Sequence, residues 1–219
     1  MFVGHYGVGL AAKQVAPGVP LWVLFIAVQL LDVVWAPLVL LGIEKLRIVP
    51  GITATNPLDL YYMPYSHGLI AAVLWSAAAS VIYRLAVRGA SSTSAVVVAA
   101  AVFSHWVLDL VVHRPDLPLY DNTAKVGLGL WNFPVVALAL EAAILFVGMW
   151  VYFKTTHARK GAMVVFGLGM LALQTYLFFG PPPVSDKAAA ATALVAYAVL
   201  AAIVRLIERR GAGAKLATA

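Results

Sequence analysis

The chain has 219 residues, of which 63% are hydrophobic and 11% are charged, and its mean hydropathy is +0.93. Apolar residues make up about half of a typical soluble domain, so this composition excludes an ordinary soluble protein and predicts a bilayer protein. A membrane-spanning helix needs about 20 apolar residues, which leaves room for about six or seven spans and no separate soluble domain. The absence of cysteine excludes disulfides, thiolate metal sites and cysteine nucleophiles. The net charge of +6 does not indicate nucleic acid binding, because the basic residues are scattered through short loops.

The predicted elements follow one another as apolar runs closed by charges, glycine or proline. Residues 1–16, which contain three glycines, are expected to form an interfacial or re-entrant segment. Residues 17–210 are expected to form one transmembrane helical domain, and residues 211–219 a flexible tail. Six spans are predicted, at about residues 20–41, 65–86, 92–112, 130–153, 161–180 and 188–207. The predicted fold class is therefore an all-α polytopic membrane bundle.

Lysine and arginine are unevenly divided between the two sides of these six spans. One side has ten, namely Lys13, Arg84, Arg88, Lys154, Arg159, Lys160, Arg205, Arg209, Arg210 and Lys215. The other side has five, namely Lys45, Arg47, Arg114, Lys125 and Lys187. Because cytoplasmic loops carry the excess of positive residues, both termini are expected in the cytoplasm. The richness in alanine and valine favours a bacterial source, and hence the bacterial cytoplasmic membrane.

Ionisable residues inside the apolar runs are the informative positions. A charge at the middle of the bilayer costs about 2.5–3.5 kcal/mol, so such residues usually serve a function. Asp32 and Glu141 lie near the middle of the first and fourth predicted spans. His105, Asp109 and His113 recur every four residues in the third, and therefore form one stripe along a helix face.

Two further histidines are candidates for the same site. His67 stands at the outer start of the second predicted helix, at a depth similar to that of His113. His5 lies in the first segment, which the predicted topology places towards the cytoplasmic end. His5 and His67 can therefore share a site only if residues 1–12 dip into the bilayer, and the glycines there permit such a dip.

Acids and imidazoles at this depth, with no lysine or arginine beside them, have two inexpensive arrangements. One is a hydrogen-bonded network of protonated carboxyls, in which the histidines and Asp32 with Gln29 serve helix packing; the other is a bound cation. Imidazole nitrogens and carboxylate oxygens suit a divalent ion, with zinc as the first candidate and manganese or iron as alternatives. The predicted metal ligands are His67, His105, Asp109, His5 and His113, and the predicted catalytic residues are Glu141 and Asp32.

Ser66 and Ser104 each precede one of these histidines. Adjacent residues on a helix diverge by about 100°, so neither pair is expected to act as a serine nucleophile with its base. Both serines are expected to form hydrogen bonds that support the ligands.

Several short motifs carry a resemblance to a known family. They are Gly4-His5-Tyr6, Asp32, Tyr65-Ser66-His67, Ser104-His105-x-x-x-Asp109-x-x-x-His113, Arg114-Pro115-Asp116-x-Pro118-Leu119, Gly129-Leu-Trp131-Asn132 and Glu141. Over about residues 1–150 the chain resembles the small bacterial multi-pass proteins called membrane-bound metal-dependent hydrolases. It lacks that family's Pro-Asp-x-Asp element after the first span and has Asp32 within the helix instead. The resemblance implies a metal site and, through it, hydrolysis.

Two kinds of function follow from these residues. The first is a membrane-embedded metallohydrolase that acts on an amphipathic or lipid-like substrate, because the predicted site opens near the outer headgroups. The second is a non-enzymatic subunit or proton relay, whose polar cluster serves packing, conduction or docking of a protein partner. The sequence assigns no partner protein or oligomeric state.

Overall fold

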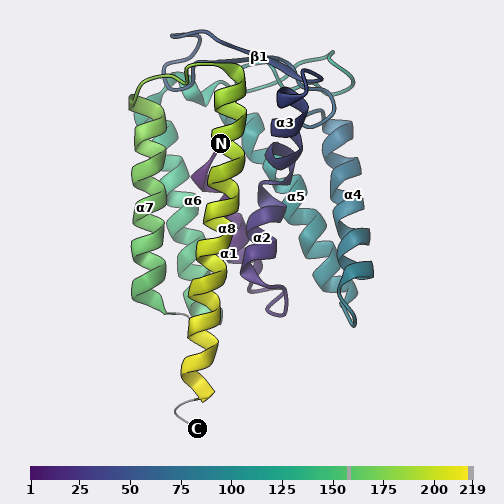
Figure 1. Ribbon diagram of the computed structural model, residues 1–219, viewed down its shortest axis with the longest axis vertical. Helices are drawn as coiled ribbons and strands as arrows, with labels where there is room; N and C mark the ends of the chain where they lie inside the picture. The colour runs from purple at the N-terminus through teal and green to yellow at the C-terminus, as the bar shows by residue number, and fades with distance from the viewer. Residues whose placement is uncertain (157–158, 217–219) are drawn as a thin grey trace.

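The computed structural model describes residues 1–156 and 159–216 and shows a bundle of helices capped at one end by a small sheet (Figure 1). The helices are α1 (Val3–Ala12), α2 (Leu21–Val28), α3 (Leu30–Leu40), α4 (Leu69–Ala86), α5 (Ser92–Val112), α6 (Pro134–Thr155), α7 (Lys160–Phe179) and α8 (Asp186–Leu216), with the short 3-10 helix η1 at Leu130–Asn132. Helices α4 to α8 are each long and apolar enough to cross a membrane, and α2 with α3 passes the same test as one bent pair, which is a broken span or a re-entrant loop. The predicted fold class, an all-α polytopic membrane bundle, is confirmed.

The first predicted span is not one helix. It breaks at Gln29 into α2 and α3, whose axes differ by 55°. Gln29 is buried and its side-chain amide donates to the carbonyl of Phe2, a polar contact that hydropathy does not reveal. In a continuous helix the carbonyl of Val28 would accept from the amide of Asp32, four residues later. The break leaves this carbonyl free to accept another hydrogen bond.

Other boundaries differ for local reasons. Helix α4 begins at Leu69 rather than at 65, because residues before Gly68 form a tight turn in which a side chain at 68 would collide with the carbonyl of Pro64. Helix α6 begins at Pro134, whose fixed φ suits a first helical position. Helix α8 continues to Leu216, so residues 211–216 of the predicted tail are helical. Residues 217–219 of that predicted tail lie outside the described residues.

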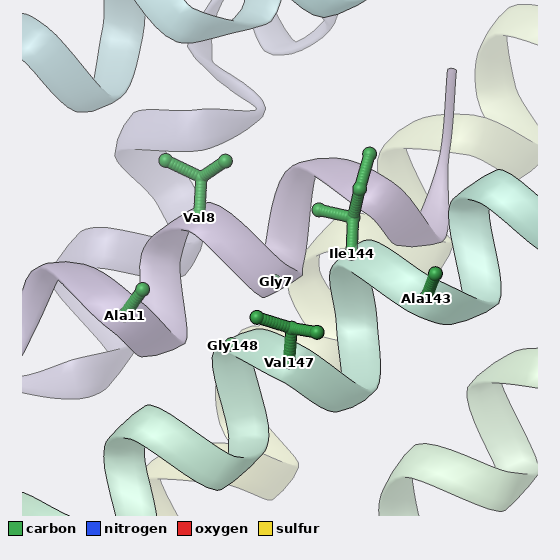
Figure 2. Close-up of a pocket in the computed structure, with 7 residues that line it drawn as sticks. All are labelled: Gly7, Val8, Ala11, Ala143, Ile144, Val147 and Gly148. Carbon is green, nitrogen blue, oxygen red and sulfur yellow. The ribbon is translucent and has the colours of Figure 1, made fainter.

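Helix α1 lies within the bundle, and seven of its ten residues are buried. It is therefore not interfacial. It packs closely against α6, where a side chain at Gly7 or Gly148 would meet the backbone of the other helix at 2.2 Å or 2.0 Å. A shallow apolar groove beside this contact is lined by both helices, with Ala11 and Ala143 among its residues (Figure 2).

Different elements lie at the two ends of the bundle. At one end, strands β1 (Lys45–Ile48) and β2 (Leu58–Tyr62) pair antiparallel and, with the loop after α5, form the cap. The C-terminal part of α8 lies at the opposite end (Figure 1), where Lys13 pairs with Glu208. Met1 lies inside the bundle, so α1 runs from the interior towards the Lys13 end.

Candidate metal centre

Four side chains from three parts of the chain meet beneath the cap. Asp32 comes from α3, His67 from the turn before α4, and His105 and Asp109 from successive turns of α5. Asp32 Oδ1 lies 3.3 Å from His67 Nε2 and 3.9 Å from His105 Nε2, and Asp109 Oδ2 lies 3.7 Å and 3.1 Å from the same two nitrogens. We call these four atoms the ligand ring.

The ring of His105 is oriented by the backbone. Its Nδ1 lies 2.7 Å from the carbonyl oxygen of Val28, the group freed by the break between α2 and α3. A carbonyl only accepts, so Nδ1 carries a proton, and in the neutral ring Nε2 keeps its lone pair. This Nε2 is buried and has no hydrogen-bond partner among the described residues.

His67 is oriented by a side chain instead. Its Nδ1 lies 2.7 Å from Ser66 Oγ, which in turn lies 2.6 Å from Glu44 Oε2. Ser66 therefore forms the expected supporting bond, but the reasoning that separated it from His67 fails because both residues precede α4. Ser104 does not support His105, since its hydroxyl donates to the carbonyl of Ala101.

His113 follows α5 and is buried between two carboxylates. Its Nδ1 lies 2.8 Å from Asp116 Oδ1 and its Nε2 lies 3.4 Å from Asp109 Oδ2, while Trp131 packs on the ring. Burial opposes the charged form, but Asp109 and Asp116 outweigh it and raise the pKa of His113 to about 9. In this arrangement His113 carries a proton on each nitrogen and links Asp109 to the cap.

His5 reaches the other oxygen of Asp109, because α1 dips into the bundle. Its Nε2 lies 3.1 Å from Asp109 Oδ1, to which the amine of Met1 also donates. The His5 ring stacks on that of His105 with centroids 3.9 Å apart, and its Nδ1 is buried without a partner. When His5 is neutral and donates from Nε2 to Asp109, its unpartnered Nδ1 is only an acceptor. The hydrogen bond from Nε2 then orients the carboxylate of Asp109.

Glu141 lies away from the ligand ring. Its Oε2 accepts from the amides of Phe2 and Gly4 at 2.9 Å and 3.2 Å, and its Oε1 accepts from Gln174 at 3.3 Å. A carboxylate at this position satisfies unpaired amides in the first turn of α1 and is favoured by the helix dipole. The structure thus gives Glu141, predicted as a general base, the task of anchoring α1.

Three residues of this neighbourhood were missed by sequence reasoning. Tyr197 of α8 donates its hydroxyl proton to Asp32 Oδ2 at 2.6 Å. Tyr197 stands out as an aromatic hydroxyl in an alanine-rich run, which was a usable signal. Asp116 was named only within the Arg114-Pro115-Asp116 motif and was given no role beside His113. Glu44 resembled a loop charge, and nothing in its surroundings pointed to Ser66.

Ion pairs cover the ligand ring on the side of the cap. Asp59 accepts from Arg47 and Arg114, and Arg114 also pairs with Asp116. Burial raises the pKa of Glu44, against the hydrogen bonds from Ser66 and Tyr65 that lower it. Among the four ring side chains, Asp32 is 16% exposed and the others are at most 4% exposed.

The ligand ring fits a divalent metal ion in size and in chemistry. Ligands about 2.0–2.1 Å from a tetrahedral ion are about 3.3–3.5 Å from one another. The separations between imidazole nitrogens and carboxylate oxygens, 3.1–3.9 Å, bracket that value. Two imidazoles and two carboxylates also match the charge of a divalent cation, and the anchored Nδ1 atoms are the supporting contacts typical of metal-binding histidines. Two groups of side chains, His5 with His105 and Asp109 and Asp32 with His67 and His105, each bring their ligand atoms within 4.8 Å of one another and could hold a metal ion.

Comparison of the chain with known protein families, with curated proteins and with solved structures finds no match.

Proposed function

We propose that the protein is a metal-dependent hydrolase embedded in a bacterial cytoplasmic membrane and acting on a lipid-like or amphipathic substrate. The observation that carries the proposal is the ligand ring. Two imidazole Nε2 atoms, one of them with its tautomer fixed by a backbone carbonyl, face carboxylate oxygens 3.1–3.9 Å away. Lone pairs that face each other at this distance repel unless a cation or a proton lies between them.

Each residue has a stated role. His67, His105 and Asp109 hold the ion, with zinc as the first candidate because tetrahedral histidine and carboxylate sites suit it. A bound divalent ion supplies a Lewis acid and lowers the pKa of its water towards 7. Asp32 is the member of the ligand ring that does not hold the ion: its Oδ1 takes the proton of the attacking water as general base, and its Oδ2 is held by Tyr197. His5 and His113 orient Asp109 from either side.

The position of the ligand ring favours a substrate that enters from the bilayer. The cap with its Asp59 ion pairs covers the polar end, and the helices that surround the ring present apolar side chains outward. Asp32, the most exposed member, lies on a membrane helix rather than in the cap. An ester, amide or phosphate bond close to an acyl chain can reach this depth more readily than a soluble metabolite can.

Metal analysis of the detergent-purified protein tests the metal site. We expect close to one transition metal ion per chain, and loss of that ion in His105→Ala and in Asp109→Ala. Asp121→Asn is the matched control, because Asp121 is exposed in the cap loop and its removal leaves the ligand ring intact. A metal-free protein whose thermal midpoint ignores both chelator and zinc would contradict the proposal and favour the proton relay or packing role.

Turnover is tested separately on the metal-loaded protein in proteoliposomes. A panel of fluorogenic lipid esters, lipid amides and phospholipids identifies the bond that is cleaved. Asp32→Asn is expected to retain the metal and to lose turnover by about 100-fold or more, the size of a general-base contribution. An Asp32→Asn protein with full turnover would remove Asp32 from the mechanism, and loaded protein without turnover on the whole panel would remove the hydrolase.

A further inference from the structure

The hydrogen bonds that lead away from His67 include a carboxylate that the proposed function does not use. Glu44, just after α3, is 1% exposed although it belongs to a loop. Its Oε1 accepts from the amides of Tyr65 and Ser66 at 2.8 Å and 2.9 Å, and its Oε2 lies 2.6 Å from Ser66 Oγ. Ser66 Oγ lies 2.7 Å from His67 Nδ1. We call Glu44, Ser66 and His67 the Glu44 relay.

The direction of the bonds in the Glu44 relay follows from what each group can do. Backbone amides only donate, so Oε1 of Glu44 is an acceptor, and the carboxylate also accepts the hydroxyl proton of Ser66 at Oε2. A serine hydroxyl has a single proton to donate. Ser66 Oγ must therefore accept from His67, which puts a proton on Nδ1 and, in the neutral ring, leaves the lone pair of Nε2 facing Asp32 and Asp109.

We propose that Glu44 is a positioning residue that sets the tautomer of His67 through the Ser66 hydroxyl, so that His67 Nε2 is free to bind a cation in the ligand ring. The inference rests on the proposed function for its purpose, since a free Nε2 matters only if the ring holds an ion. It does not rest on hydrolysis. Glu44 touches no member of the ligand ring except through Ser66.

Glu44→Gln is the decisive change because it alters direction with little change in shape. A glutamine at 44 keeps a carbonyl oxygen for the two backbone amides and places an NH₂ group next to Ser66 Oγ. Ser66 then accepts from the glutamine and donates its own proton to His67 Nδ1. The histidine proton is displaced to Nε2, which can no longer bind a metal.

The experiment reads the tautomer directly from the ring ¹⁵N resonances of His67 in chelator-treated protein in detergent, assigned by comparison with His67→Gln. We expect Nδ1–H with a bare Nε2 in the original protein and Nε2–H in Glu44→Gln. Zinc affinity is expected to fall 10–100-fold in Glu44→Gln, as it does when supporting partners of metal ligands are removed. Glu208→Gln, at the opposite end of the bundle, is the control and should change neither readout.

Ser66→Ala tests the same relay from its middle. It should also abolish the preference for Nδ1–H, and adding Glu44→Gln to it should weaken zinc binding no further, because the two residues act in series. A Glu44→Gln or Ser66→Ala protein that keeps Nδ1–H overturns the inference even if zinc binding weakens. A tautomer that switches in a protein that binds no metal upholds the inference and overturns the proposed function.

Discussion

Asp109 and Asp59 are both buried carboxylates towards the capped end of the bundle, with exposed fractions of 2% and 5%, but their neighbours differ. Asp59 accepts from the guanidinium groups of Arg47 and Arg114, which are always protonated. Asp109 accepts from the Met1 amine at Oδ1, and its Oδ2 faces the imidazoles of His67, His105 and His113. The comparison shows that burial does not make a cation site. Guanidinium groups, which keep their protons, face both oxygens of Asp59, whereas Oδ2 of Asp109 faces imidazole nitrogens, which can release a proton and leave room for an ion.

The largest expected effect separates the two carboxylates by metal binding. Asp109→Asn should weaken zinc binding by at least 100-fold, because it removes a charged ligand from the ring. Asp59→Asn should change zinc affinity less than threefold, since its oxygens face only arginines. Isothermal titration of both chelator-treated proteins measures the difference. Equal losses in the two variants would show that both carboxylates belong to one electrostatic unit.

Removal of Asp59 should lower the stability of the protein although it leaves the metal site intact. Asp59→Ala leaves the partly buried Arg114 without one of its carboxylates, and a broken ion pair of this kind costs about 3 kcal/mol. We expect a lower thermal midpoint in detergent with the metal still bound. Asp186→Ala, a carboxylate at the start of α8, serves as the control. An unchanged midpoint in Asp59→Ala would mean that the arginines find other partners.

Met1 and His5, at the start of the chain and in α1, contact Asp109, whereas Asp59 pairs with Arg47 and Arg114. A change that weakens the packing of α1 should therefore affect the surroundings of Asp109 and not those of Asp59. Gly148→Ala places a methyl group 2.0 Å from the carbonyl of Gly7, and overpacking of this kind costs about 2 kcal/mol. Zinc binding should weaken as well, because His5 moves with α1. Gly169→Ala on α7 meets open space and should be neutral in both thermal and titration measurements. Tight zinc binding in a destabilised Gly148→Ala protein would separate α1 from the metal site.

The smallest effect concerns the hydrogen bond between Tyr197 and Asp32. Tyr197→Phe removes one bond to a carboxylate and should lower stability by about 1 kcal/mol, with a modest fall in turnover because Asp32 is less well oriented. Tyr176→Phe, at an exposed position on α7, is the matched control. A larger loss of turnover than of stability would indicate that Tyr197 contacts the substrate as well as Asp32.

Much of the fold follows from hydropathy, because the bilayer requires long apolar helices. The predicted span at 92–112 coincides with α5, where Ser91 accepts from the amide of Ser94 as an N-cap. The break at Gln29 was not predictable. It depends on contacts with Phe2 and His105, which are remote in sequence.

The site was accessible to sequence reasoning where its residues share a helix. The four-residue spacing of His105, Asp109 and His113 places them on one face in any helix, and their depth marks them as unusual. Spacing says nothing about contacts between helices, so the bond between Tyr197 and Asp32, 165 residues apart, had no periodic signal. Glu141 lies at the predicted depth, but its side chain points to the amides of α1 and not to the ligand ring. Depth in the bilayer could not distinguish these two directions.

The break between α2 and α3 has a consequence for how the three anchored imidazoles can change over evolutionary time. The acceptors of His67 and His113 are side chains, so one codon change can remove either. The acceptor of His105 is a main-chain oxygen that no replacement of Val28 deletes. Its orientation can be lost only if the helix straightens and reclaims that oxygen. The orientation of His105 therefore withstands replacement of its acceptor residue, whereas the orientation of His67 or His113 is lost when Ser66 or Asp116 is replaced.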